Sequence, residues 1–146
     1  MIKLFILLFV TTSLVAQNQY NTKKGYVAAG YDVVSYFSND KPVEGSDKFE
    51  TTFDNVKFKF TSEANLNLFK ANPKKYVPQY GGYCAYAIGA KGKKFTVDPN
   101  TFEIRDGKLF LFYNKGKTNT LKFWLDQNPD ELKEKADKNW GKIIKN

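Results

Sequence analysis

The chain has 146 residues, a formal net charge of +8, no histidine and a single cysteine, Cys84. Without histidine, the usual Ser-His and Cys-His catalytic sites and imidazole metal ligands are excluded. One cysteine excludes an intrachain disulfide, a Cys-x-x-Cys redox pair and any zinc site that needs two thiolates. Arg105 is the only arginine, and dispersed lysines lack the planar fork that grips phosphate, so we expect no nucleic-acid partner.

The N-terminus is typical of a secretory signal peptide. Lys3 precedes an apolar run over residues 4–10, and Ser13 to Ala16 form a cleavage site. The run is shorter than the roughly 20 residues of a membrane span. We therefore expect cleavage after Ala16, a secreted or periplasmic chain with no membrane span, a flexible leader over residues 17–24, and one domain over residues 25–146.

The first half of that domain predicts strands and one helix. Residues 31–37 are rich in β-branched and aromatic side chains, which favours a strand. Residues 49–53 and 56–60 flank Asp54-Asn55 and alternate between polar and apolar, which predicts a hairpin. Thr61 or Ser62 can then cap a helix that stops before Pro73.

The second half predicts two hairpins and two helices. Residues 83–88 and 95–97 suit one hairpin, and residues 101–105 and 108–113 flank Asp106-Gly107, a strong type I′ turn signal. A helix carries Leu121, Trp124 and Leu125 on one stripe, and Asn128 with Pro129 begins another. The predicted fold class is α+β, a small, largely antiparallel sheet of hairpins with one internal helix and two C-terminal helices packed on it.

Cys84 has two interpretations. In a strand, Cys84, Tyr86 and Ile88 share one face, so a core position for Ile88 would bury the thiol as a small hydrophobe. Alternatively, Cys84 borders a pocket in which lysines or a helix N-terminus activate the thiolate. Asp32 leaves a similar choice between capping a local turn and supplying a carboxylate to a site.

Several stretches together resemble the exported, stand-alone branch of the YHS-domain family. They are GYDVVSYF (30–37), KPVEGS (41–46), FKFTSEAN (58–65), FKANPKKY (69–76) and QYGGYCAY (79–86), in that order. The resemblance covers residues 30–140 and implies the family fold and a relation to metal-handling domains. The metal-type members carry cysteines where this chain has Thr61 and Asn65, and the signature histidine is missing near residues 52–54, so the family's ligands do not carry over.

We therefore expect a non-catalytic, secreted module of the cell envelope that binds a small ligand or a metal ion. The candidate ligand-binding residues lie near the cysteine or in the first tyrosine-rich stretch: Tyr31, Asp32, Tyr36, Tyr83, Cys84 and Tyr86. Cys84 is the candidate metal ligand, for copper or zinc, although one thiolate in a monomer is not expected to hold either ion tightly. A homodimer joined at Cys84 would supply more donors. The alternative is a thiol-dependent enzyme or redox protein that uses Cys84.

Overall fold

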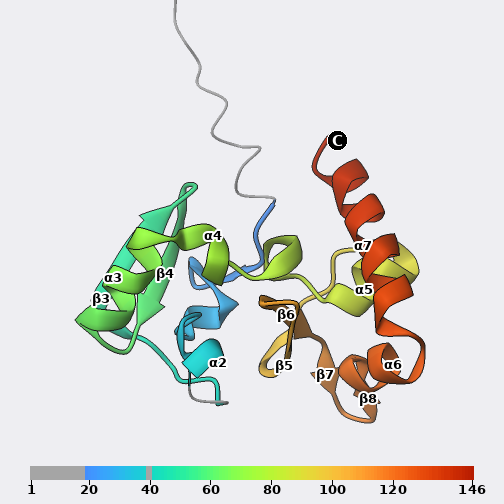
Figure 1. Ribbon diagram of the computed structural model, residues 1–146, viewed down its shortest axis with the longest axis horizontal. Coiled ribbons are helices and arrows are strands. Elements are labelled where there is room, and N and C mark those ends of the chain that lie inside the picture. The colour runs from blue at the N-terminus through green and yellow to red at the C-terminus, as the bar shows by residue number, and fades with distance from the viewer. Residues whose placement is uncertain (1–18, 39–40) are drawn as a thin grey trace, which may run out of the picture.

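A computed structural model describes residues 19–38 and 41–146, and it confirms the α+β class (Figure 1). Within these residues the strands form three small sheets rather than one. The first is four-stranded, in the order β1 (Thr22–Lys23), β2 (Tyr26–Val27), β4 (Val56–Phe60) and β3 (Ser46–Phe53). The other two are the pairs β5 (Asp98–Arg105) with β6 (Lys108–Phe112) and β7 (Asn114–Lys115) with β8 (Thr118–Asn119). Within the four-stranded sheet, β2 runs parallel to β4. In Figure 1 the hairpin of β3 and β4 lies at one end of the molecule with helices α3 (Glu63–Ala71) and α4 (Pro73–Tyr76). Helices α5 (Ala85–Lys91), α6 (Thr120–Asp126) and α7 (Pro129–Ile143) lie at the other end, and β5-β6 lies between the two groups.

The N-terminal sheet contains the first predicted hairpin, which is confirmed. Strands β3 (Ser46–Phe53) and β4 (Val56–Phe60) pair antiparallel around Asp54 and Asn55. Both turn residues have positive φ, 50° and 65°, as a type I′ turn requires. The domain starts earlier than expected, because β1 (Thr22–Lys23) and β2 (Tyr26–Val27) form part of this sheet. The leader expected over residues 17–24 is therefore structured from Thr22.

The strand predicted over residues 31–37 is wrong. After a 3-10 turn, η1 (Ala28–Gly30), Tyr31 makes one isolated bridge to Glu44, and the chain then enters the short helix α2 (Ser35–Ser38). The cause is Asp32, whose Oδ1 accepts hydrogen bonds from the backbone N–H groups of Val34 and Ser35. Such local bonds offer the backbone an alternative to a strand ladder.

The predicted internal helix is confirmed as α3 (Glu63–Ala71), capped by Ser62, which accepts a bond from the Asn65 backbone N–H. A short helix, α4 (Pro73–Tyr76), and a second 3-10 turn, η2 (Gln79–Gly82), follow where a plain connection was expected. Phe69 of α3 lies against the aromatic side chains of β4, with ring centroids 4.7 Å from Phe58 and 5.0 Å from Phe60. The helix therefore covers the apolar face of the hairpin.

Strand β6 (Lys108–Phe112) separates two hydrophobic clusters. It pairs with β5 (Asp98–Arg105) through the predicted Asp106-Gly107 turn, which is confirmed. Leu109 and Leu111 belong to the cluster under the N-terminal sheet, whereas Phe110 and Phe112 belong to the cluster under the C-terminal helices. Because successive side chains of a strand point to opposite faces, β6 contributes to both hydrophobic clusters and lies between them.

The strand predicted over residues 83–88 is also wrong, because Ala85–Lys91 forms helix α5. Gly92, with φ of 63°, ends this helix in the left-handed conformation. A β-carbon on Gly89 would lie 2.6 Å from the Leu132 carbonyl oxygen, so glycine permits α5 to approach α7 closely. The partner expected over residues 95–97 forms no strand, and Phe95 instead accepts a bond from the Cys84 N–H through its carbonyl, at 3.0 Å.

Both predicted C-terminal helices are confirmed, as α6 (Thr120–Asp126) and α7 (Pro129–Ile143). A small hairpin of β7 (Asn114–Lys115) and β8 (Thr118–Asn119), absent from the prediction, precedes them.

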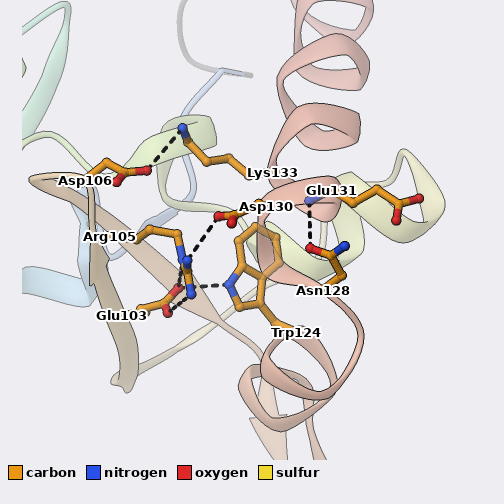
Figure 2. Close-up of polar contacts among 8 residues, drawn as sticks. All are labelled: Glu103, Arg105, Asp106, Trp124, Asn128, Asp130, Glu131 and Lys133. Atoms are coloured by element: carbon orange, nitrogen blue, oxygen red, sulfur yellow. Dashed lines mark hydrogen bonds and ion pairs between the residues drawn. The ribbon is translucent and has the colours of Figure 1, made fainter.

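Polar contacts join the β5-β6 hairpin to these helices (Figure 2). Glu103 accepts bonds from the indole N–H of Trp124 at 2.8 Å and from the guanidinium of Arg105 at 2.8 Å. Arg105 also pairs with Asp130 at 3.1 Å, at the start of α7. The Glu103 carboxylate therefore helps to fix the hairpin against α6, and Arg105 links it to α7.

Candidate functional site

The six candidate residues lie in two separate places. Tyr31 packs against the N-terminal cluster and Tyr36 belongs to it, with Asp32 between them in the chain, whereas Tyr83 and Tyr86 pack against the C-terminal cluster. Because β6 stands between the clusters, no single site unites all six residues.

Asp32 is a fully buried carboxylate at the centre of a hydrogen-bond network. Its Oδ2 accepts from the Thr61 backbone N–H at 2.9 Å, the Thr61 hydroxyl at 2.8 Å and the Asn65 side-chain amide at 2.8 Å. Its Oδ1 accepts from the N–H groups of Val34 at 2.9 Å and Ser35 at 3.3 Å. Five donors occupy a group that offers about four lone-pair directions. Asp32 therefore positions the chain and is closed to a ligand.

This network also tests the implied metal site. Thr61 and Asn65, which the resemblance aligns with cysteines of the metal-type members, both act as donors toward Asp32 and, with the N–H groups of Val34 and Ser35, leave Asp32 no free lone pair. A soft metal ion prefers thiolate, thioether or imidazole ligands, and none is present in this network. The residues do not fit a copper or zinc ion. Within residues 19–38 and 41–146, no group of three or more His, Cys, Asp or Glu side chains is placed to hold a metal.

Tyr36 is buried, and its hydroxyl donates to the Pro99 carbonyl oxygen at 2.6 Å. Burial, assisted by the nearby Tyr31, Asp98 and Asp32, raises the pKa of Tyr36 well above its usual range. The neutral phenol is thus held as a donor to the backbone. Its role is to fix Pro99, since the hydroxyl is already engaged.

Tyr31 lines a cavity. The cavity has a volume of about 650 Å³, and Ala29, Tyr31 and Pro99 line one part of it. Its charged lining comes from segments far apart in the sequence: Lys23, Lys24, Glu44, Lys59 and Lys115. The sequence analysis did not identify these lysines, because no local pattern indicates that the segments around residues 23, 44, 59 and 115 meet in the fold.

The cavity is strongly basic. Four lysines against one glutamate give its lining a formal charge of +3. Lys59 pairs with Asp47 at 2.5 Å and lies 4.1 Å from the centroid of the Tyr26 ring. In the part of the chain that the structure describes, Lys23, Lys24 and Lys115 make no ion pair, so their charge is available to a ligand.

The backbone beside this cavity is strained. Ala28 and Ala29 have φ values of 52° and 54°, in the left-handed region that alanine rarely adopts. Each such residue costs about 1 kcal/mol or more. Strain of this kind persists where the surrounding structure holds it, and it is frequent at binding sites.

Cys84 is buried, with none of its surface exposed. Its Sγ lies 3.3 Å from Oγ1 of Thr120, and the Thr120 hydroxyl donates its single proton to the Tyr113 carbonyl oxygen at 2.7 Å. The thiol therefore donates to Thr120, and a thiolate would face oxygen lone pairs. This environment suits a packed neutral thiol better than a nucleophile, as the first of the two interpretations expected.

The two tyrosines that flank Cys84 point elsewhere. The Tyr83 hydroxyl donates to the Tyr20 carbonyl oxygen at 3.3 Å, and burial raises the pKa of Tyr83. Tyr86 contacts Gln127 through its hydroxyl and Phe123 through its ring, at 5.7 Å between centroids. Tyr86 lines a smaller, separate cavity.

No family model matches the chain, and neither a curated protein nor a solved structure matches it significantly. In the described ranges, every helix is too short or too polar to cross a bilayer.

Proposed function

We propose that the chain is an exported, YHS-domain-like, non-catalytic module that binds a small carboxylate or phosphate anion in the basic cavity beside Tyr31. The observation that carries the proposal is the meeting of Lys23, Lys24, Lys59 and Lys115 around one hollow of about 650 Å³. Small-molecule sites have volumes of roughly 300–1,000 Å³ and use a few convergent polar groups to orient the ligand. Lysine ammonium groups bind carboxylates and phosphates as point charges.

Two other candidate residues, Asp32 and Tyr36, form hydrogen bonds to the backbone of segments that line this cavity. Tyr36 holds Pro99 in its wall by a 2.6 Å hydrogen bond. The Asp32 N–H donates to the Val43 carbonyl at 2.8 Å, next to Glu44, which also lines the cavity. Asp32 and Tyr36 are thus positioning residues, and Tyr31 is the candidate for direct contact.

The alternative of a thiol-dependent enzyme finds less support. Cys84 has no exposed surface, and its sulfur donates to Thr120 rather than facing a base. Ligand binding without chemistry is therefore the function we propose.

Titration of 15N-labelled protein with citrate and with inorganic phosphate, at low ionic strength, tests this function. We expect saturable chemical-shift changes in residues that line the cavity. Lys115→Glu should weaken binding about fivefold or more, since it replaces an attractive charge by a repulsive one. Lys117→Glu is the matched control, because Lys117 lies in the turn of the same hairpin and does not line the cavity.

Two results would overturn the proposal. One is the absence of saturable shifts at the cavity with either anion. The other is equal weakening by both variants, which would mean that the anions respond only to the overall positive charge.

A further inference from the structure

A second cavity, distinct from the basic one, lies between α5, α6 and the β7-β8 hairpin. Its volume is about 320 Å³. Aromatic side chains make up much of its lining: Tyr86, Phe95, Tyr113 and Phe123. None of these residues lines the basic cavity. Binding in this cavity is therefore independent of the anion binding proposed for the basic cavity.

Two phenylalanines of this cavity are unusually exposed. Phe95 is 38% exposed and Phe123 is 37% exposed, although large apolar side chains tend to be buried. Phe123 also packs on the ring of Tyr86. Aromatic surface that gathers around a hollow marks a binding site more often than isolated exposed residues do.

The two buried residues of the lining, Ala87 and Thr120, offer a ligand no free side-chain donor. The side chain of Ala87 has no polar atom, and the Thr120 hydroxyl donates its single proton to the Tyr113 carbonyl oxygen at 2.7 Å. An apolar part of a ligand suits the position beside Ala87 and Thr120, because an acceptor placed there would lose its hydration without a donor to replace it.

Lys91 supplies the one charge of the lining. Its ammonium lies 5.5 Å from the centroid of the Phe95 ring. Within the described residues, Lys91 has no carboxylate partner at ion-pair distance. A lysine held over an aromatic ring at the edge of an apolar hollow can attract a carboxylate while the hollow takes a ring.

From these contacts we infer that the cavity is a binding site for a small aromatic carboxylate. The ring of the ligand packs among Phe95, Phe123 and Tyr86, and its carboxylate meets the ammonium of Lys91. The ligand class differs from that of the basic cavity in needing an apolar ring, and the two sites are distinguished by the residues that report binding.

Phenylacetate is the probe, with phenylacetamide as its uncharged counterpart, and binding is followed by chemical-shift changes in 15N-labelled protein. We expect saturable shifts at residues of α5 and α6 that line the cavity. Phe123→Ala should weaken phenylacetate binding about tenfold or more, because it removes part of the apolar wall. The matched control is Leu125→Ala on the same helix, since Leu125 is 51% exposed and does not line the cavity.

Lys91→Gln tests the contribution of the lysine charge to binding, and it provides a second variant if Phe123→Ala does not fold. It should weaken phenylacetate about fivefold and leave phenylacetamide unchanged within about twofold. The inference is overturned if phenylacetate gives no saturable shifts at α5 and α6. It is also overturned if Phe123→Ala and Leu125→Ala weaken binding equally, or if Lys91→Gln affects both probes alike.

Discussion

Asp32→Asn replaces one oxygen of the buried carboxylate by an amide NH2 and changes little else in shape. The oxygen that remains can still accept from the N–H groups of Val34 and Ser35. The new NH2 group takes the place of Oδ2 and faces three donors, two of them on Thr61 and one on Asn65. In the variant, the new amide donor therefore faces three hydrogen-bond donors in the protein interior, and those donors lose their acceptor.

The loss in the free energy of unfolding depends on which of those donors can change its orientation. The Thr61 hydroxyl can rotate to accept a bond, and the Asn65 amide can turn to present its oxygen. The backbone N–H of Thr61 has no such freedom, and an unsatisfied buried donor costs about 1–3 kcal/mol. Weaker neutral bonds add to this cost, whereas removing a buried charge offsets part of it. We expect a loss of about 2 kcal/mol in the free energy of unfolding, or a melting temperature lower by on the order of 8 °C.

Urea unfolding followed by circular dichroism and tryptophan fluorescence measures this loss. Asp98→Asn is the matched control, because Asp98 Oδ1 accepts from the backbone N–H and the side-chain amide of Asn100, and the donor to Oδ2 among the described residues is the Thr101 hydroxyl, which can rotate. That variant should lose less than about 1 kcal/mol. Equal losses in the two variants, or a fully stable Asp32→Asn, would refute the reasoning.

Two further outcomes are expected from buried side chains. Burial raises the pKa of Tyr36, and burial with the Asp137 carboxylate raises that of Tyr80. Their stabilising contribution is therefore complete below about pH 10 and is lost as pH rises above that value; a urea midpoint that stays constant up to about pH 12 in the wild type would contradict this. N-ethylmaleimide should modify Cys84 at least about 100-fold more slowly in the native protein than in the urea-unfolded chain, because the sulfur is exposed only by opening. A native rate within about tenfold of the unfolded rate would count against the packed thiol.

Local signals predicted the elements that depend on local chemistry. The turns at Asp54-Asn55 and Asp106-Gly107 adopt positive φ, and Ser62 and Asn128 cap their helices as expected. Three predicted strands, over residues 31–37, 83–88 and 95–97, did not form, and the first two failed for different reasons. Aromatic and β-branched composition favours a strand, but at residues 31–37 the Asp32 side chain bonds the backbone locally, and at residues 83–88 helix packing against α7 decides.

Burial of Cys84 was one of the two alternatives, and it holds for a different reason. The strand argument put Cys84 and Ile88 on one face by a period of two. In the structure they lie four residues apart at the start of a helix, which again places them on one face, and both are fully buried. The basic cavity, in contrast, could not be predicted, because Lys23, Lys59 and Lys115 meet only through the tertiary fold.

Strand β6 has consequences for how the molecule comes apart. Its four buried residues alternate between the two clusters, with Leu109 and Leu111 on one side and Phe110 and Phe112 on the other. A slip of one residue in its pairing would exchange leucines and phenylalanines in both interiors at once. Because both hydrophobic clusters pack on β6, neither cluster can unfold while the other stays intact. We therefore expect unfolding to be a single cooperative step in which both clusters are lost together.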